Sequence, residues 1–440
     1  IETGWASTGD NKLKLPLDNI IWKIKGNNVL TPGNPITLEW DNEEGLIFTK
    51  KIELDENFLF KITQSIKNNS NKSFQFFPYA QITRNYKTEV TPIYILHEGF
   101  LGVFGDELKE LDYEDVDEEK FIMNNLKGWL GITDKYWLTA IVPEKGKNFK
   151  SEFLSKGGKY RANFIIKDSS ILNPGDSVTN EIKAFTAAKE VAVIDNYAEK
   201  LGIEKFDLTI DWGWFYFFTK PLFFVIDYFF RMTGNFGLAI VIITALVRLI
   251  FFPLANYSFR SMAKMKVLQP EMVRLKELHK DDKVKLQQEM MALYKREKVN
   301  PISGCLPVLI QIPFFFAIYK MLFVTLEMRH QPFFGWIEDL SARDPTSIFN
   351  LFGLIPWDPP TFLMIGAWPI LMGVSMWVQQ KLNPTPPDPV QAKIFMFFPL
   401  FLTIILAPFP SGLVVYWTVN NVLTIAQQWV IMRGTKVKTV

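Results

Sequence analysis

The stretch Gly237–Ala255, GLAIVIITALVRLIFFPLA, carries a single charged residue, Arg248, in an otherwise apolar run. A helix rises by about 1.5 Å per residue, so Arg248 is expected well inside a hydrocarbon layer that is about 30 Å thick. A guanidinium keeps its proton there, and its burial costs at least about 2.5–3.5 kcal/mol. We therefore expect the helix to turn Arg248 toward water or a polar partner. A snorkelling arginine near a helix end is the alternative.

The two halves of the chain differ in charge. Residues 1–211 carry 26 basic and 33 acidic side chains, whereas residues 212–440 carry 22 and 13. The overall charge of +2 therefore combines an acidic half with a basic half. The single cysteine, Cys305, allows no disulfide within the chain. Because the sequence starts at Ile1 without an apolar run, a signal or anchor segment is expected to have been removed or to lie outside it.

Residues 1–205 are predicted to form one domain, in which the pattern from Ile20 to about Phe185 is mostly that of β-strands. Apolar residues alternate with mainly polar neighbours in Phe58–Ile66, and similar runs follow Gly, Pro, Asn and Asp turns at 73–83, 136–142, 161–167 and 177–185. This pattern predicts an antiparallel β-sandwich, followed by a short helix over Glu190–Leu201.

The acid-rich run Asp106–Glu119 is interpreted as a solvated loop, because its carboxylates lack the regular spacing of metal ligands. Sugar-processing sandwiches need an acid/base set, whereas this half of the chain holds one histidine, His97. We therefore expect no catalytic role for the sandwich.

Residues 206–235 are predicted to be a linker that contains an amphipathic helix. Within DWGWFYFFTKPLFFVIDYFFRMTG, which covers 211–234, the charged residues Lys220, Asp227 and Arg231 are spaced i, i+7 and i+11. That spacing places them on one helical face among Phe, Trp and Tyr, which favours a helix lying in the membrane interface. A true span is the alternative and would reverse the sidedness of the chain.

Residues 236–440 are predicted to form an α-helical polytopic membrane domain. Five apolar runs suit membrane spans, at about 236–255, 302–326, 361–380, 394–409 and 412–431. Residues 256–300 hold 11 Lys and Arg, and the tail from Met432 holds three, whereas 327–360 holds two basic and five acidic residues. By the positive-inside rule, the connection 256–300 and the tail face the cytoplasm. Residues 1–211 then lie on the opposite side.

The basic connection is predicted to be an antiparallel helical hairpin. Met262, Met265, Met272 and Leu275 follow one stripe, and a second stripe follows a turn at 279–282, where an aspartate can cap the second helix. Methionine suits surfaces that accept varied apolar partners, although ordinary packing within the hairpin is the alternative. The partner-binding surface is assigned to Met262, Lys264, Met265, Lys266, Met290 and Met291.

The sequence lacks the motifs of an ATPase or a metalloenzyme. It has no GxxxxGK[ST] loop and no His/Cys cluster at metal spacing, so we expect no cofactor. The spans hold amides and hydroxyls but no Asp or Glu, which proton-coupled transporters usually need. Such groups beside a fixed positive charge predict a hydrated groove, formed by Thr244, Arg248, Gln311, Asn420 and Gln427.

Four strings of the second half resemble, in the same order, the YidC family of bacterial membrane protein insertases. They are TALVRLIFFPL, SMAKMKVLQPEM, DDKVKLQQEMMALYKREKVNPISGCLPVLIQIPFFFAIYKML and FPSGLVVYWTVNNVLTIAQQW. The resemblance covers about Asp211–Arg433, and more weakly the sandwich, which looks like the family's periplasmic domain with a β-supersandwich-like fold. Two features depart from the family pattern: its N-terminal membrane anchor is missing, and Leu351–Pro360 looks like an insertion.

The resemblance implies an inner-membrane insertase and chaperone that acts alone or beside the Sec translocon. It implies that Arg248 is the arginine of the family's cytoplasm-open groove, with Thr244, Tyr416 and Trp417 as substrate contacts. The partners implied are nascent membrane proteins, the ribosome, the Sec translocon, the signal recognition particle receptor and the lipid bilayer. The resemblance also implies that the protein functions as a monomer.

The predicted mechanism needs no fuel. A groove that reaches partway into the bilayer shortens the barrier for a hydrophilic tail, while Arg248 attracts acids on that tail. Burial of about 20 apolar client residues then drives insertion. A solute transporter or channel is the alternative, although the spans show no inverted repeats. A carbohydrate-binding or epimerising sandwich tethered to a membrane is a third interpretation.

Overall fold

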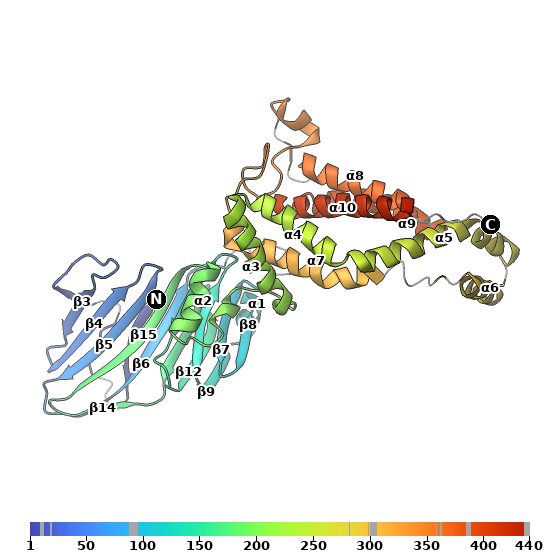
Figure 1. Ribbon diagram of the computed structural model, residues 1–440. Helices are drawn as coiled ribbons and strands as arrows, with labels where there is room; N and C mark the ends of the chain where they lie inside the picture. Colours follow the sequence, from blue (N-terminus) through green and yellow to red (C-terminus); the bar gives the residue numbers. More distant parts are fainter. Residues whose placement is uncertain are drawn as a thin grey trace. The chain divides into compact units, whose positions relative to one another are not determined.

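The computed structural model describes residues 1–8, 13–17, 20–87, 96–280, 282–297, 299, 306–357, 359–360, 363–383 and 389–434. The chain forms two compact units, residues 1–211 with 324–326 and residues 212–323 with 327–440. The first unit is built from strands and the second from helices (Figure 1). Cys305 lies outside the described residues.

Two antiparallel sheets form the first unit. The larger sheet has the strand order β2 (Lys23–Lys25), β3 (Ile36–Asp41), β4 (Leu46–Leu54), β5 (Leu59–Asn68), β15 (Ser177–Ala188), β11 (Trp137–Val142), β10 (Gly128–Thr133), β7 (Gly99–Phe104) and β8 (Glu107–Leu111). The smaller sheet has the order β1 (Glu2–Ser7), β6 (Phe74–Arg84), β13 (Lys159–Ile166), β12 (Phe149–Lys156) and β9 (Phe121–Leu126), with β14 (Ser170–Leu172) paired to β6. The predicted antiparallel β-sandwich is confirmed.

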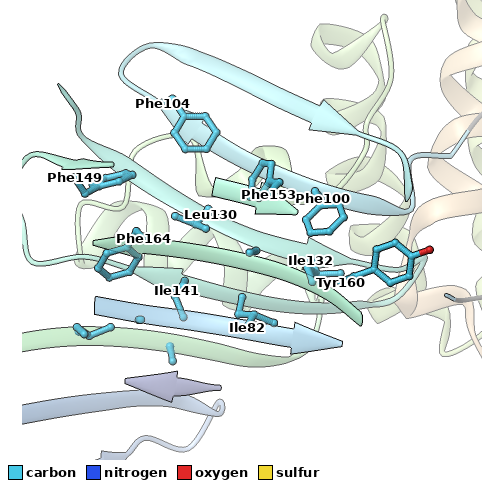
Figure 2. Close-up of a cluster of buried hydrophobic side chains, with 14 of the residues drawn as sticks. Ile82, Phe100, Phe104, Leu130, Ile132, Ile141, Phe149, Phe153, Tyr160 and Phe164 are labelled. Atoms are coloured by element: carbon cyan, nitrogen blue, oxygen red, sulfur yellow. The ribbon is translucent and has the colours of Figure 1, made fainter. Parts of the chain in front are cut away.

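The core of the sandwich follows from the two-residue period of its strands. In β13, Tyr160, Ala162, Phe164 and Ile166 are buried, while the residues between them are partly or fully exposed. These side chains join Phe100, Phe104, Phe149 and Phe153 in one apolar cluster between the sheets (Figure 2). Most aromatic ring pairs there are edge-on or tilted, for example Tyr113 against Tyr160 at 4.7 Å between centroids, while Phe121 stacks on Phe153.

The opposite face of the larger sheet is partly covered by the C-terminal segment of the first unit, residues 191–209. Leu130 belongs to the core, so its neighbour Trp129 points to the other face. There it meets Phe206 of the 3₁₀ turn η1 (Phe206–Thr209), and Phe185 meets Tyr197 of α2 (Val191–Lys200). The predicted helix at Glu190–Leu201 is thereby confirmed within one residue at each end.

The acid-rich run Asp106–Glu119 is not a loop, contrary to prediction. Its first part is the edge strand β8, and its second part is α1 (Tyr113–Glu118). Asp112 and Asp115 form a capping box at the start of α1, while Tyr113 and Val116 are fully buried. The prediction was wrong because it considered only the density of charge, whereas the capping box and the two buried side chains stabilise a helix.

The strand predicted at Phe58–Ile66 begins one residue later than expected. Phe58 has a left-handed φ of 64° and is exposed. The preceding turn is closed by Asp55, whose carboxylate accepts hydrogen bonds from the amides of Asn57 and Leu59. Phe58 therefore belongs to the turn, and the alternating strand begins at Leu59.

The second unit contains eight α-helices among the described residues. They are α3 (Tyr216–Thr233), α4 (Phe236–Ile250), α5 (Phe252–Leu278), α6 (Lys283–Arg296), α7 (Leu306–Val324), α8 (Ala367–Leu382), α9 (Pro389–Leu406) and α10 (Ser411–Gly434). Helix α10 packs against α4, α5 and α8, and α9 packs against α8 (Figure 1).

The amphipathic helix expected in the linker corresponds to α3. Asp227 and Arg231, one turn apart, form an ion pair of 2.8 Å on it. Gly234, with φ of 68°, ends the helix in the left-handed conformation. Asn235 then accepts a hydrogen bond from the Leu238 amide and begins α4.

The span predicted at 236–255 is broken rather than continuous. Helix α4 ends at Ile250, and α5 leaves it at an angle of 67°. Pro253 lies in the first turn of α5, where its missing N–H is tolerated, whereas in one continuous helix its ring would clash with a carbonyl. The first arm of the hairpin therefore starts at Phe252, not at residue 256.

By length and hydropathy, none of the described helices alone meets the requirement for crossing a bilayer, while the bent pair α4–α5 meets it jointly. Shorter apolar helices occupy Ile312–Val324 and Val390–Leu406. The predicted spans at 361–380 and 394–409 correspond to α8 and α9, shifted by several residues.

Candidate functional site

Arg248 lies in the last turn of α4 and is half-buried. Its Nε donates a hydrogen bond of 2.9 Å to Oδ1 of Asn420 in α10. A guanidinium offers five N–H donors, and within the described part of the chain no carboxylate forms an ion pair with this one. The partner of the charge is therefore a neutral amide, which orients the side chain without cancelling its field.

Helix α10 presents a polar row toward Arg248. Tyr416, Asn420 and Gln427 are spaced i, i+4 and i+11, which places them on one helical face. Both amide atoms of Gln427 are shielded from solvent and have no hydrogen-bond partner among the described residues. Leaving a buried amide unpaired is costly, so Gln427 is the residue of this row whose polar atoms the described residues leave unsatisfied.

A second polar row of α10 has a structural role. Asn421 donates a hydrogen bond of 3.1 Å to Ser375, and Gln428 donates one of 3.1 Å to Asn383. Both acceptors are in or next to α8. This row therefore holds α10 against α8, about 100° around the helix from the row that contains Asn420.

Two other residues predicted for the groove, Thr244 and Gln311, show no polar group directed toward it among the described side chains. Thr244 is buried one turn before Arg248, and its hydroxyl donates a hydrogen bond of 2.6 Å to the Ile240 carbonyl in the same helix. Its polar group is therefore satisfied without a client. The backbone of Gln311 belongs to α7, and its side chain lies outside the described residues.

Tyr416 and Trp417 are buried between helices. The Trp417 ring stacks on Phe315 of α7, with centroids 5.7 Å apart and planes at 17°. Phe409 packs edge-on against the same ring at 6.0 Å. Phe315 was not among the residues predicted for the groove. Its only signal was the run Phe314–Phe316, which does not tell which of the three rings faces α10.

Burial changes along α4 and α10 at the level of Arg248. All residues from Ser411 to Thr418 are buried, and so is most of Phe236–Thr244. Beyond Arg248 and Asn420, side chains such as Leu249, Ile250 and Trp429 are exposed. The first halves of the two helices are therefore largely enclosed, whereas beyond Asn420 exposed side chains of α10 alternate with buried ones such as Thr424, Gln428 and Ile431.

The consecutive helices α5 and α6 contact each other, as expected of a helical hairpin. Asp282 caps α6 by accepting a hydrogen bond of 2.9 Å from the Lys285 amide. Arg296 near the end of α6 contacts Glu271 of α5 at 2.8 Å, and the Tyr294 hydroxyl lies 4.0 Å from the sulfur of Met272. These pairs join the first arm to the second at a distance from the turn.

The residues assigned to a partner surface differ in exposure. Lys264, Lys266 and Met291 are exposed, whereas Met265 and Met290 are half-buried. Met262 packs against a cluster of Ala255, Phe259 and Ile431, which fixes the start of α5 to the end of α10. Part of the methionine row therefore packs inside the protein.

No group of three or more His, Cys, Asp or Glu side chains among the described residues is arranged to hold a metal ion.

Two family models together match nearly the whole chain. Residues 1–225 match the model described as the YidC periplasmic domain, and residues 228–438 match the one described as the 60Kd inner membrane protein. A crystal structure of an active YidC insertase with its first transmembrane domain resolved aligns with a TM-score of 0.39 and 18% identity, covering 96% of this chain and 82% of that one.

Curated relatives align with almost the whole of this chain. The membrane protein insertase YidC of Pelagibacter ubique is 60% identical over 100% of this chain and 78% of its own length. That of Nitrobacter hamburgensis is 48% identical over 99% of this chain and 75% of its own length. The chain therefore belongs to the YidC family of membrane protein insertases, with the family's periplasmic domain followed by its inner-membrane domain.

Proposed function

We propose that this insertase passes the polar tails of nascent membrane proteins through a one-sided groove centred on Arg248. The observation that carries the proposal is the hydrogen bond between Arg248 and the neutral amide of Asn420, which leaves the positive charge without an ion-pair partner among the described residues. The cytoplasmic entrance of the groove lies beyond Arg248 and Asn420, where part of the side chains of α10 are exposed.

The physical benefit is a shorter path through low dielectric. A polar tail costs most at the centre of the hydrocarbon layer, and a hydrated recess that reaches Arg248 removes part of that distance. Attraction between a guanidinium and a carboxylate weakens in water but grows as the effective dielectric constant falls. An acidic group on the tail therefore gains most at the level of Arg248, while the apolar client helix leaves into lipid.

The hairpin suits an encounter with the ribosome. Residues 256–300 hold 11 basic side chains, among which Lys264 and Lys266 are exposed. A basic surface of this kind attracts the phosphates of ribosomal RNA. Contacts with the Sec translocon and the signal recognition particle receptor, and action as a monomer, complete the proposal on the strength of the family resemblance.

Graded substitutions of Arg248 test the groove. Arg248→Lys keeps a charge of the same sign and should retain much of the activity. Arg248→Ala should lower the insertion of clients with acidic tails by about tenfold, equivalent to about 1.4 kcal/mol, and that of neutral clients by less than about twofold. The measurement is insertion into liposomes of paired acidic and neutral clients, normalised to folded insertase.

The control is Arg231→Ala, which removes an equally basic but exposed side chain from α3. It should leave both clients unaffected. Equal loss for acidic and neutral clients in Arg248→Ala would contradict the electrostatic part of the proposal. Parallel losses of folded protein in Arg248→Lys and Arg248→Ala would show that the arginine acts through stability alone.

A further inference from the structure

Asp344 is a buried carboxylate in the connection between α7 and α8, and it is 2% exposed. Its Oδ1 accepts hydrogen bonds from the Trp336 indole at 3.1 Å and from the amide and hydroxyl of Thr346 at 3.0 and 2.7 Å. Its Oδ2 accepts one from the Trp368 amide at 2.9 Å. Four donors therefore converge on one side chain, which compensates the loss of its hydration.

The donor at Trp368 belongs to the first turn of α8. Asp344 thus caps this helix from 24 residues away and places a negative charge at its positive end. Thr346 adds a second cap, because its hydroxyl oxygen accepts a hydrogen bond of 2.9 Å from the Ala367 amide. Gly366 leaves room for this arrangement, since a Cβ there would lie 2.4 Å from Cγ of Asp344.

The same connection also reaches two other helix N-termini. The carbonyl of Ala342 accepts hydrogen bonds from the amide and the hydroxyl of Ser411, and the carbonyl of Leu340 accepts one of 2.8 Å from the Gly412 amide. The Phe333 ring lies so close to Gly237 in α4 that a Cβ would be 2.0 Å from it. Residues 333–347, here named the loop clamp, therefore join the starts of α4, α8 and α10.

We propose that Asp344 is a positioning residue that closes the end of the helix bundle opposite the groove entrance. By fixing the starts of α4 and α10, the clamp keeps their first halves packed and holds Asn420 opposite Arg248. The consequence for insertion rests on the proposed groove, whereas the closure itself can be measured independently. The closed segment Ser411–Thr418 is the part of α10 nearest to the clamp.

A cysteine at Thr418 reports on the closure. Thr418 is buried, and its hydroxyl is bonded only within its own helix among the described contacts, to the Val414 carbonyl, so Thr418→Cys is a mild change. In full-length protein with Cys305→Ser, an impermeant maleimide added to spheroplasts should label this cysteine slowly. Asp344→Ala should raise the labelling rate by about tenfold, because capping and bridging hydrogen bonds are lost together.

Asp344→Asn should give an intermediate rate. Its carbonyl oxygen can still accept from Trp336 and Thr346, but its amide group meets the Trp368 amide donor to donor. Both variants should lower the insertion of acidic and neutral clients alike, because the defect is geometric. Arg248→Ala, in contrast, is expected to affect acidic clients most. The labelling experiment therefore tests the loop clamp even if the charge-based proposal for the groove is wrong.

Glu338→Ala is the matched control. This carboxylate, from the same connection, is exposed and makes no hydrogen bond or ion pair among the described contacts. Its loss should leave labelling at Thr418→Cys unchanged. Unchanged labelling in Asp344→Asn and Asp344→Ala would overturn the proposal, as would an equal rise in Glu338→Ala. If Asp344→Ala does not fold, the rate in Asp344→Asn alone decides.

Discussion

The pairing of Arg248 with Asn420 distinguishes this site from an ordinary buried ion pair. A carboxylate in the place of the amide would neutralise the guanidinium and remove its effect on an incoming tail. The amide contributes a hydrogen bond to a charged group, worth about 1.5–3 kcal/mol, and fixes the side chain toward α10. Orientation and charge are therefore supplied by different residues.

Asn420→Asp is expected to convert the site into an ion pair. The folded protein should accumulate normally, because the new carboxylate faces a guanidinium at about hydrogen-bond distance. Insertion of acidic clients should nevertheless fall about as far as in Arg248→Ala, by about tenfold. Asn420→Ala, which keeps the charge uncompensated, should have a smaller effect. The comparison uses the same pair of acidic and neutral clients, and wild-type insertion by Asn420→Asp would contradict the role of net charge.

Among the elements, the bent pair α4–α5 links the groove to the hairpin. The bend at Phe251 directs α5 away from the axis of α4, and the cluster of Ala255, Phe259 and Ile431 holds the start of α5 on α10. The remaining part of α5 and all of α6 extend beyond this cluster and carry the basic surface. The hairpin should therefore be removable without loss of the helices around Arg248.

Replacement of residues 264–297 by a short Gly/Ser linker should leave the protein folded and weaken its association with ribosomes. Association of the intact protein should fall steeply as salt increases, because it releases counterions from RNA. Co-sedimentation with ribosomes at two salt concentrations measures both effects. Asp282→Ala should destabilise α6 by about 1 kcal/mol through loss of its cap, with a smaller effect on binding. Unchanged association after the replacement would reduce the hairpin to a structural cap.

At the scale of the whole molecule, the acidic and basic halves of the sequence coincide with two structural units. The family places the first unit in the periplasm and the second in the inner membrane. For the connections of the second unit, charge supplies the proposed sidedness: residues 256–300 are basic and residues 327–360 are acidic. The interfacial placement of α3 follows from the same assignment.

Cysteine labelling of intact spheroplasts tests this topology. In a Cys305→Ser background, cysteines at Asp168 in the sandwich and Glu338 in the loop clamp should react with an impermeant reagent, since both side chains are exposed. A cysteine at Lys285 in the hairpin should react only after the membrane is opened. Reaction at position 285 in closed spheroplasts would mean that α3 crosses the membrane, and the interfacial assignment would be wrong.

Local patterns in the sequence were sufficient for the fold class and for many of its elements, although not for β8, α1 or the break between α4 and α5. Two-residue alternation predicted the sandwich strands, because a strand between two sheets shows one face to the core. The aspartate cap of α6 and the helix at 190–201 also follow from neighbouring residues. The family motifs identified the membrane domain. That Arg248 needs a polar partner follows from charge and hydrocarbon alone.

The identity of that partner was decided only by tertiary structure. Asn420 and Asn421 are adjacent amides, and sequence cannot tell which one faces Arg248, because the answer depends on the rotation of α10 about its axis. In the structure Asn420 binds the arginine and Asn421 binds α8. The convergence of four donors on Asp344 is equally invisible in sequence. Periodicity reports the neighbours of a residue along its own element, whereas contacts between distant elements arise from packing.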